Sequence, residues 1–180
     1  RVRRIGEAAE RILKFTRDLV AYARPTGDSR GPVQIQEVIE RALVFCEHEF
    51  ADGRVEVEHD FSEPLPMLVG IPGQLTQVFV NLFTNAAHAM GERGGVLRIA
   101  VRTADSGESL RIDVSDSGNG IPAEAMPQIF EPFFTTKTDG RGTGLGLSIV
   151  RGILDAHGGT IQVSSAHGQG TSFTLTLPVG

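Results

Sequence analysis

Four glycines alternate with other residues from Gly140 to Gly146, and an apolar, helix-like run follows at once. The stretch reads GRGTGLGLSIV over residues 140–150. Glycine loses more conformational freedom on folding than any other residue, so this density indicates backbone that approaches something closely. The start of a helix offers unpaired N–H groups and the positive end of its dipole, and phosphate satisfies both. A flexible glycine-rich linker is the alternative.

Two familiar phosphate-binding loops do not fit this stretch. It lacks the Lys-Ser/Thr ending of a P-loop, and its glycines do not have the G-x-G-x-x-G spacing that follows a strand in a dinucleotide-binding unit. A phosphate bound at Gly140–Gly146 is therefore held by another geometry.

From Pro32 onwards the sequence alternates helical and strand patterns. Apolar periodicity predicts helices over about 34–50, over 72–90, and from near Leu145 to about Ala156. Strands are predicted over 54–60, 96–103, 110–115, 160–164 and 172–177. Strands of period two leave one sheet face wet and place helices on the other. We expect an α/β (α+β) fold, a two-layer α/β sandwich of a mixed sheet covered on one face by three helices.

The first 24 residues form a separate predicted element. Apolar residues from Val2 to Ala23 follow the alternating three-and-four spacing of a coiled-coil or helical-bundle seam. An ordinary surface helix is the alternative. Pro25, Gly27 and the polar residues to Gly31 end this helix. We expect one long bundle-type helix plus linker over residues 1–31, a second domain over 32–180, and a longer parent protein.

Charge and hydropathy exclude two classes of partner. The net charge of −5 gives no basic footprint for nucleic acid. No apolar run approaches the ~20 residues that cross a bilayer. The single cysteine, Cys46, lies in an apolar helical pattern typical of core packing. We expect a cytoplasmic domain that contacts neither nucleic acid nor membrane, on a protein that can be anchored elsewhere.

Asn81 and Asn85 lie four residues apart in the predicted helix over 72–90, hence on one face of it. Amide oxygens placed in this way can share a hard cation such as Mg²⁺, which is usually held by few protein groups plus substrate phosphates. Alone, the pair is a weak signal, because polar residues at this spacing also occur on ordinary surfaces.

Asp116 opens the sequence DSGNG directly after a predicted strand. These residues are favourable for a turn, which is the simplest interpretation. An ionised carboxylate only accepts hydrogen bonds, so Asp116 can pair with the amino group of adenine and would repel the oxygen that guanine shows at that position. A nucleotide site containing Asp116 should select adenine.

The segment from Ile121 to Arg141 is too long and too rich in phenylalanine for a plain connector. It holds Phe130, Phe133 and Phe134 near Lys137 and Arg141. Long loops of this kind are often lids, and the two cations could meet phosphate oxygens. A hydrophobic loop that binds a partner is the alternative.

Taken in order, NLFTNA, DSGNG, FEPFFTTK, GTGLGL and GQGTSF resemble the N, G1, F, G2 and G3 boxes of sensor histidine kinases. These kinases belong to an ATPase superfamily that includes type II topoisomerases and mismatch-repair ATPases. Each motif is modest, but five in sequence are specific. The resemblance covers the chain from Val33 to Val179, and residues 1–24 resemble the second helix of the family's dimerisation and phosphotransfer hairpin.

The resemblance implies that the domain binds ATP and Mg²⁺. Asn85 and Asn81 would hold the metal, and Asp116 would recognise adenine while Gly118 and Gly120 let the backbone pass the base. The glycines Gly142, Gly144 and Gly146 would wrap the phosphates. The resemblance also places in the nucleotide site His88, Ile121, Phe130, Lys137, Arg141, Thr143, Leu145, Leu147 and Thr171.

The family transfers the γ-phosphoryl group of ATP to a histidine on its hairpin and then to a response regulator. That histidine lies on the first hairpin helix, ahead of an acidic residue and a proline. The five histidines of this chain are outside such a setting, so we expect it to phosphorylate a supplied hairpin and not itself. The partners that the resemblance implies are ATP, the hairpin of a homodimer and the receiver domain of a response regulator. A nucleotide-gated binding module and an ATP-hydrolysing relative are the alternatives.

Three positions depart from family patterns or separate its branches. ATP-hydrolysing relatives carry Glu, a general base toward water, where this chain has Asn81, so the sequence favours the kinase reaction. His88 stands where relatives often place Lys or Arg, and neutral imidazole is a weaker phosphate clamp. Ile71 precedes Pro72 where Asp is usual, so its side chain supplies no oxygen to cap the helix.

Overall fold

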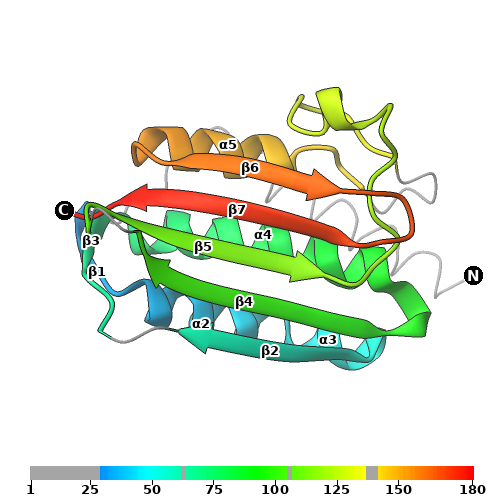
Figure 1. The fold of residues 1–180 in the computed structure, drawn as a ribbon, viewed down its shortest axis with the longest axis horizontal. Coiled ribbons are helices and arrows are strands. Elements are labelled where there is room, and N and C mark those ends of the chain that lie inside the picture. The colour runs from blue at the N-terminus through cyan, green and yellow to red at the C-terminus, as the bar shows by residue number, and fades with distance from the viewer. Residues whose placement is uncertain (1–28, 62–63, 105–106, 137–141) are drawn as a thin grey trace, which may run out of the picture.

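The computed structural model describes residues 29–61, 64–104, 107–136 and 142–180. The predicted helix over residues 1–24 lies outside them. Five strands form one sheet in the order β2-β4-β5-β7-β6 (Figure 1). These strands are β2 (Val55–Phe61), β4 (Gly95–Thr103), β5 (Ser109–Asp116), β6 (Thr160–Ser165) and β7 (Thr171–Pro178). Strand β2 runs parallel to β4 and the other neighbours are antiparallel, which confirms the mixed sheet.

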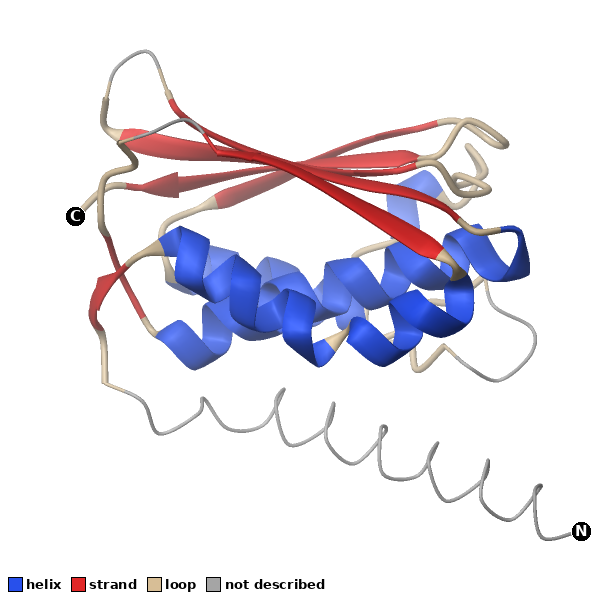
Figure 2. Ribbon diagram, turned by 90° about the horizontal axis from the view of Figure 1, so that it is seen from below, coloured by secondary structure: helices blue, strands red, loops and turns tan. Residues whose placement is uncertain are grey.

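The α-helices of the described residues all lie on one face of the sheet, as Figure 2 shows. They are α2 (Ile35–Phe45), α3 (Glu47–Gly53), α4 (Pro72–Met90) and α5 (Gly146–Ala156). Two single 3₁₀ turns, η1 (Gly91–Arg93) and η2 (Met126–Gln128), follow α4 and β5 along the chain. Helix α4 packs between α2 and α5, and its Phe79 and Phe83 are fully buried beneath the sheet. The predicted two-layer sandwich is confirmed.

The first predicted helix is two helices in the structure. Helix α2 ends at Phe45, and α3 begins at Glu47 after Cys46, whose φ of −101° and ψ of 4° are not helical. Cys46 is nonetheless buried, and the break lets Phe50 pack against Phe83 with ring centroids 6.3 Å apart. The apolar spacing continues through the break, so periodicity could not reveal it.

A second, two-stranded sheet was not predicted. Strand β1 (Gly31–Val33) pairs antiparallel with β3 (Leu68–Gly70), and Leu68 also bridges to Val179 near the end of the chain. Strands of three residues are too short to show a period of two. This small sheet fixes the entry to α2 and the entry to α4 side by side.

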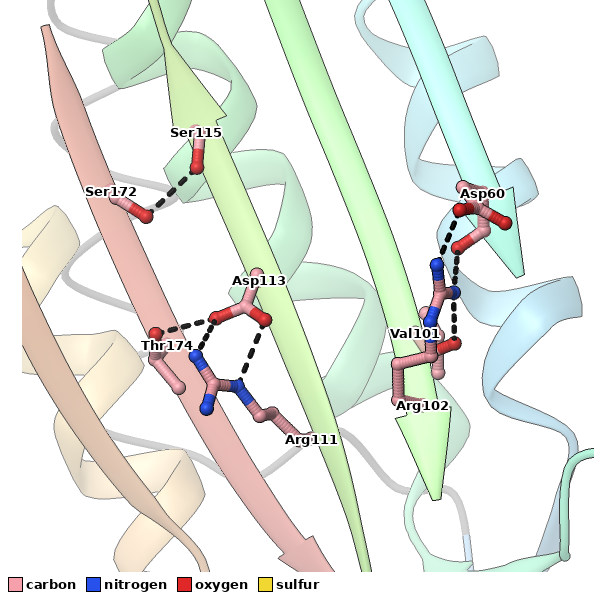
Figure 3. Close-up of polar contacts among 8 residues, drawn as sticks. All are labelled: Asp60, Val101, Arg102, Arg111, Asp113, Ser115, Ser172 and Thr174. Carbon is pink, nitrogen blue, oxygen red and sulfur yellow. Dashed lines mark hydrogen bonds and ion pairs between the residues drawn. The ribbon is translucent and has the colours of Figure 1, made fainter. Parts of the chain in front are cut away.

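The face of the sheet away from the helices is covered by polar pairs (Figure 3). Arg111 donates two hydrogen bonds to Asp113, which also accepts one from Thr174. Partial burial alone would raise the pKa of Asp113, but these hydrogen bonds and the positive charges of Arg111 and Arg102 together outweigh it and hold the pKa below its usual 3.8. Arg102 of β4 lies directly opposite Arg111 of β5 in the strand register. Arg102 forms its own ion pair with Asp60 of β2. The like charges are therefore separately compensated, as a solvated sheet face requires.

The start of α4 is completed by a histidine from another helix. A helix leaves its first four N–H groups unpaired. The first belongs to Ile71, which donates to Nε2 of His157 at 3.0 Å, and the second position is Pro72, which has no N–H. Because Nδ1 of His157 lies 2.8 Å from the carbonyl oxygen of Ile153, that nitrogen carries the proton and Nε2 accepts. The missing Asp cap is thus replaced by a buried imidazole.

We expect His157→Ala to lower the free energy of unfolding by about 2–4 kcal/mol, because it orphans the N–H of Ile71 and leaves a cavity. His167→Ala, at an exposed position, is the matched control and should cost less than about 0.5 kcal/mol. Urea titration at neutral pH measures both. Equal losses in the two variants would contradict the capping role.

Candidate functional site

A cavity of about 1070 Å³ opens between α4, the loop after β5, the segment before α5 and the start of β7. In Figure 1 these parts meet at the end of the sheet where β5 finishes and β7 begins. Asp116, Asn81 and Asn85 all line this cavity, together with Gly142, Gly144 and Gly146. The motifs that are far apart in the sequence therefore surround one space.

Helix α4 supplies one wall of the cavity. Gln77, Asn81, Asn85 and His88 line it at intervals of four, four and three residues, so they form one stripe along the helix. The opposite face carries Phe79 and Phe83 into the core, which fixes the rotation of α4. Gln77 donates to Oδ1 of Asn81 at 3.3 Å, and Nδ2 of Asn81 donates to the carbonyl of Gly146 at 3.2 Å.

Asp116 stands at the other end of the cavity, on the last residue of β5. Its Oδ1 accepts the N–H of Gly118 at 2.8 Å. Burial raises the pKa of this carboxyl, although hydrogen bonds from the backbone of Gly118 and Thr171 act in the opposite direction. A fixed, partly desolvated acceptor of this kind is suited to an amino group of a ligand.

The loop that carries Asp116 is held from two sides. Gly118 packs against α4, because a Cβ there would lie 2.7 Å from the carbonyl carbon of Ala89. Asn119 donates its N–H to the carbonyl of Ala89, and its own carbonyl accepts the N–H of Gly168. Ile121 donates its N–H to the hydroxyl of Ser165. These contacts fix the loop before any ligand binds.

The segment before α5 closes the opposite side. Gly144 has a φ of +70° and packs on Phe133, whose N–H donates to the carbonyl of Gly144 at 2.8 Å. A Cβ at Gly144 would lie 2.4 Å from the carbonyl carbon of Phe133, so glycine is required. Thr143 and Leu147 also line the cavity, and the hydroxyl of Thr143 accepts the N–H of Leu145 at 3.4 Å. The first turn of α5 thus faces the space that Asp116 and Asn85 share.

Most of the predicted site residues line the cavity, and three described ones do not. Besides those named above, Gly120, Ile121 and Thr171 line it. Gly118 packs on Ala89, and Leu145 is buried as the residue before α5. Phe130 lies under the guanidinium of Arg151, 5.7 Å from the ring centroid. Lys137 and Arg141 lie outside the described residues.

Sequence reasoning missed several lining residues. Gln77 could have been found, because it extends the stripe of Asn81 and Asn85 by one more turn. An apolar part of the cavity wall is formed by Ile129, Phe134 and Phe173, and no local sequence pattern indicates this role. The lining also includes Thr84, Asn119, Thr135 and Thr136, and on the side of α2 and α3 it reaches Arg41, Phe45 and Glu49.

Residues 70–180 match the family described as histidine kinase-, DNA gyrase B-, and HSP90-like ATPase. That match contains α4, most of the cavity lining and the five-stranded sheet except β2, and it spans more than half of the chain. The chain belongs to this ATPase family.

Curated relatives of this ATPase domain include two sensor kinases. The sensor histidine kinase ZraS of Escherichia coli K12 is 37% identical over 175 residues, covering 97% of this chain and 37% of ZraS. The sensory histidine kinase/phosphatase NtrB of Rhodobacter capsulatus is 36% identical over 185 residues, covering 97% of this chain and 51% of NtrB. The chain therefore spans about a third to a half of these relatives.

Solved structures share the fold of the ATPase domain. The catalytic domain of the histidine kinase ThkA, in a nucleotide-free form, superposes with a TM-score of 0.72 at 31% identity, covering 84% of this chain and 98% of that domain. Full-length ShkA in complex with AMPPNP gives a TM-score of 0.79 at 28% identity, covering 96% of this chain and 36% of ShkA. In the described part of the ATPase domain, no helix combines the length and hydropathy of a membrane span.

Proposed function

We propose that this chain is the catalytic domain of a two-component sensor histidine kinase. It binds ATP with Mg²⁺ and transfers the γ-phosphoryl group to a histidine on a hairpin of the longer protein, for onward transfer to a response regulator. The observation that carries the proposal is one cavity with Asp116 at one end, Asn85 on the α4 wall and Gly144 and Gly146 opposite. ThkA has been solved in complex with the response regulator TrrA, and this chain matches that structure at 25% identity with a TM-score of 0.76.

The two ends of the cavity suit the two ends of ATP. Asp116 is an acceptor fixed by the N–H of Gly118, and it can accept a hydrogen bond from the adenine amino group. Ile121, Ile129 and Phe173 give the apolar wall that a base needs. Gly142, Gly144 and the first turn of α5 offer backbone N–H groups to phosphate oxygens.

The donor set fits Mg²⁺ held jointly with the nucleotide. Among the described residues, no three His, Cys, Asp or Glu side chains gather to hold a metal ion by themselves. Amide oxygens of α4 line the cavity instead, and Mg²⁺ commonly takes few protein ligands plus phosphate oxygens. Asn85 would hold the ion, with Asn81 as a second candidate. When bound, Mg²⁺ neutralises charge on the β- and γ-phosphates.

In the proposed reaction a neutral imidazole nitrogen of the hairpin attacks the γ-phosphorus, the bond from that phosphorus to the bridging oxygen breaks, and ADP leaves with the electron pair. This chain's residues position the nucleotide and stabilise charge. Asn81 cannot take a proton from water as Glu would, which favours transfer to histidine over hydrolysis. His88 lines the cavity beside Asn85, where it can meet a phosphate oxygen.

The test mixes this chain with a separately produced histidine-phosphotransfer hairpin of a sensor histidine kinase, Mg²⁺ and radiolabelled ATP. We expect acid-labile label on the hairpin, none on this chain, and labelling that ATP supports and GTP does not. A hairpin with its histidine changed to Gln is the matched control. Steady release of inorganic phosphate without labelled hairpin would contradict the proposal and favour the ATP-hydrolysing alternative.

A further inference from the structure

A chain of three polar groups links α4 to the beginning of α5. Nε2 of Gln77 donates to Oδ1 of Asn81 at 3.3 Å, and Nδ2 of Asn81 donates to the carbonyl oxygen of Gly146 at 3.2 Å. Gln77 and Asn81 are one turn apart on α4, while Gly146 is the first residue of α5, 65 positions further along the chain than Asn81. The second bond is therefore a tertiary contact between two walls of the cavity.

The direction of these hydrogen bonds is set by the backbone. A carbonyl oxygen only accepts, so Asn81 must present its nitrogen to Gly146. Its oxygen then faces the opposite way, toward Gln77, and the group of Gln77 that meets it must be the amide nitrogen. The orientation of both amides follows from one carbonyl.

This orientation separates Asn81 from Asn85. Gln77 lies one turn toward the start of α4 and Asn85 one turn toward its end, so Oδ1 of Asn81 is directed away from Asn85. The side-chain oxygen of Asn81 is therefore already engaged by Gln77. A Cβ placed on Gly146 would lie 3.8 Å from Cγ and 3.9 Å from Oδ1 of Asn81, and 3.9 Å from Nδ2 of Asn85, so the start of α5 sits against both side chains.

Building on the proposed function, we propose that Asn81 is a positioning residue and not a ligand of Mg²⁺. Its amide holds the first turn of α5 against α4, and Gln77 sets the orientation of that amide. Gly146 and Leu147, which line the phosphate side of the cavity, are then in place before the nucleotide arrives, which reduces the ordering cost of binding. Asn85 is left as the α4 ligand of the metal.

The first experiment measures hydrogen exchange over residues 145–151 in the nucleotide-free chain. Gln77→Met keeps the length of the side chain and removes the donor, so exchange there should accelerate about three- to tenfold, the value of one hydrogen bond. Gln77→Lys restores a donor and should exchange like the wild type. Gln36→Met, a helical glutamine of α2 outside the cavity lining, is the matched control and should also exchange like the wild type.

The second experiment measures the affinity of AMPPNP by calorimetry with and without Mg²⁺. A positioning role predicts that Gln77→Met and Asn81→Ala weaken binding by the same factor in both conditions, about three- to tenfold. Asn85→Ala should instead abolish the gain in affinity that Mg²⁺ confers. The proposal is overturned if Asn81→Ala weakens AMPPNP binding only when Mg²⁺ is present. It is also overturned if the amides of residues 145–151 exchange at the same rate in Gln77→Met as in Gln36→Met.

These outcomes are distinct from failure of the proposed function. If the wild-type chain does not bind AMPPNP, or binds it without phosphorylating a hairpin, the kinase assignment fails while the exchange experiment still reports on the contact between α4 and α5. If the wild type binds and transfers but Gln77→Met and Gln77→Lys behave alike, the kinase assignment stands and the positioning role is wrong.

Discussion

Replacing Asp116 by Asn is expected to weaken ATP binding by about 30-fold or more, at least about 2 kcal/mol. The variant removes a charged acceptor from the adenine amino group, in a partly buried position where unmet polar groups are expensive. Asn can keep its oxygen toward the N–H of Gly118, which leaves its own NH₂ facing the amino group of the base. Calorimetric titration with AMPPNP and with a GTP analogue measures the loss and the narrowing of the preference for adenine.

The same substitution should not destabilise the nucleotide-free domain. Burial raises the folded-state pKa of Asp116 above its unfolded value, so ionised Asp116 costs stability at neutral pH. This cost is absent below the unfolded pKa and appears as the pH rises through the folded pKa. Asp116→Asn removes it, so the Tm at pH 7 should stay level or rise, and the difference from the wild type should shrink in acid.

Asp155→Asn is the control, because Asp155 is an exposed carboxylate of α5. It should leave both affinity and Tm within error of the wild type. If Asp116→Asn binds AMPPNP as tightly as Asp155→Asn does, the carboxylate does not recognise the base. If Asp116→Asn instead lowers the Tm by several degrees, the residue serves the fold, and loss of binding would say nothing about adenine.

The sequence predicted best what local periodicity encodes. Leu110, Ile112 and Val114 alternate with polar residues, and in the structure they fill the core while Arg111 and Asp113 form an ion pair on the solvent face. The order of the strands is not encoded locally. The parallel pairing of β2 with β4 depends on α4 and β3 crossing between them, so it is a property of the whole chain.

Other features could not be predicted from the sequence because the residues that cause them are distant along the chain. Helix α4 begins at Pro72, the preceding Ile71 supplies no side-chain cap, and the group that completes the start of the helix is His157, 86 residues after Ile71. The break between α2 and α3 at Cys46 could not be predicted because the spacing of buried positions continues on both sides of it. The resemblance implies that Gly118 lets the backbone pass the base, but the close contact with Ala89 of α4 is a packing reason for this glycine that a sequence motif cannot show.

The glycines of the turn between β6 and β7 allow a sharp test of how that turn supports the site. Gly168 and Gly170 both have positive φ, +78° and +80°, so each disfavours a side chain through backbone strain alone. Their surroundings differ. A Cβ at Gly168 would meet nothing within 4 Å, whereas one at Gly170 would lie 2.0 Å from the carbonyl oxygen of Asp116.

Gly168→Ala should therefore lower the free energy of unfolding by about 1–2 kcal/mol, which is the backbone strain of a non-glycine residue in the left-handed region. Gly170→Ala adds a collision with backbone that cannot move freely, since Asp116 ends β5 and pairs with Thr171 of β7. We expect at least about 3 kcal/mol in total, among the largest effects of a single substitution. Urea titration of both variants separates the cost of backbone strain, which both share, from the cost of the collision with Asp116, which only Gly170→Ala has.

Nucleotide binding should follow the same difference. In Gly170→Ala, whatever fraction stays folded must displace the carbonyl of Asp116, and the carboxylate of that residue moves with its backbone. Loss of AMPPNP affinity should then exceed what unfolding explains, while Gly168→Ala binds like the wild type once corrected for its folded fraction. Equal stability and equal affinity in the two variants would mean that the turn is free to shift, and that the position of Asp116 is set by β5 and the loop after it alone.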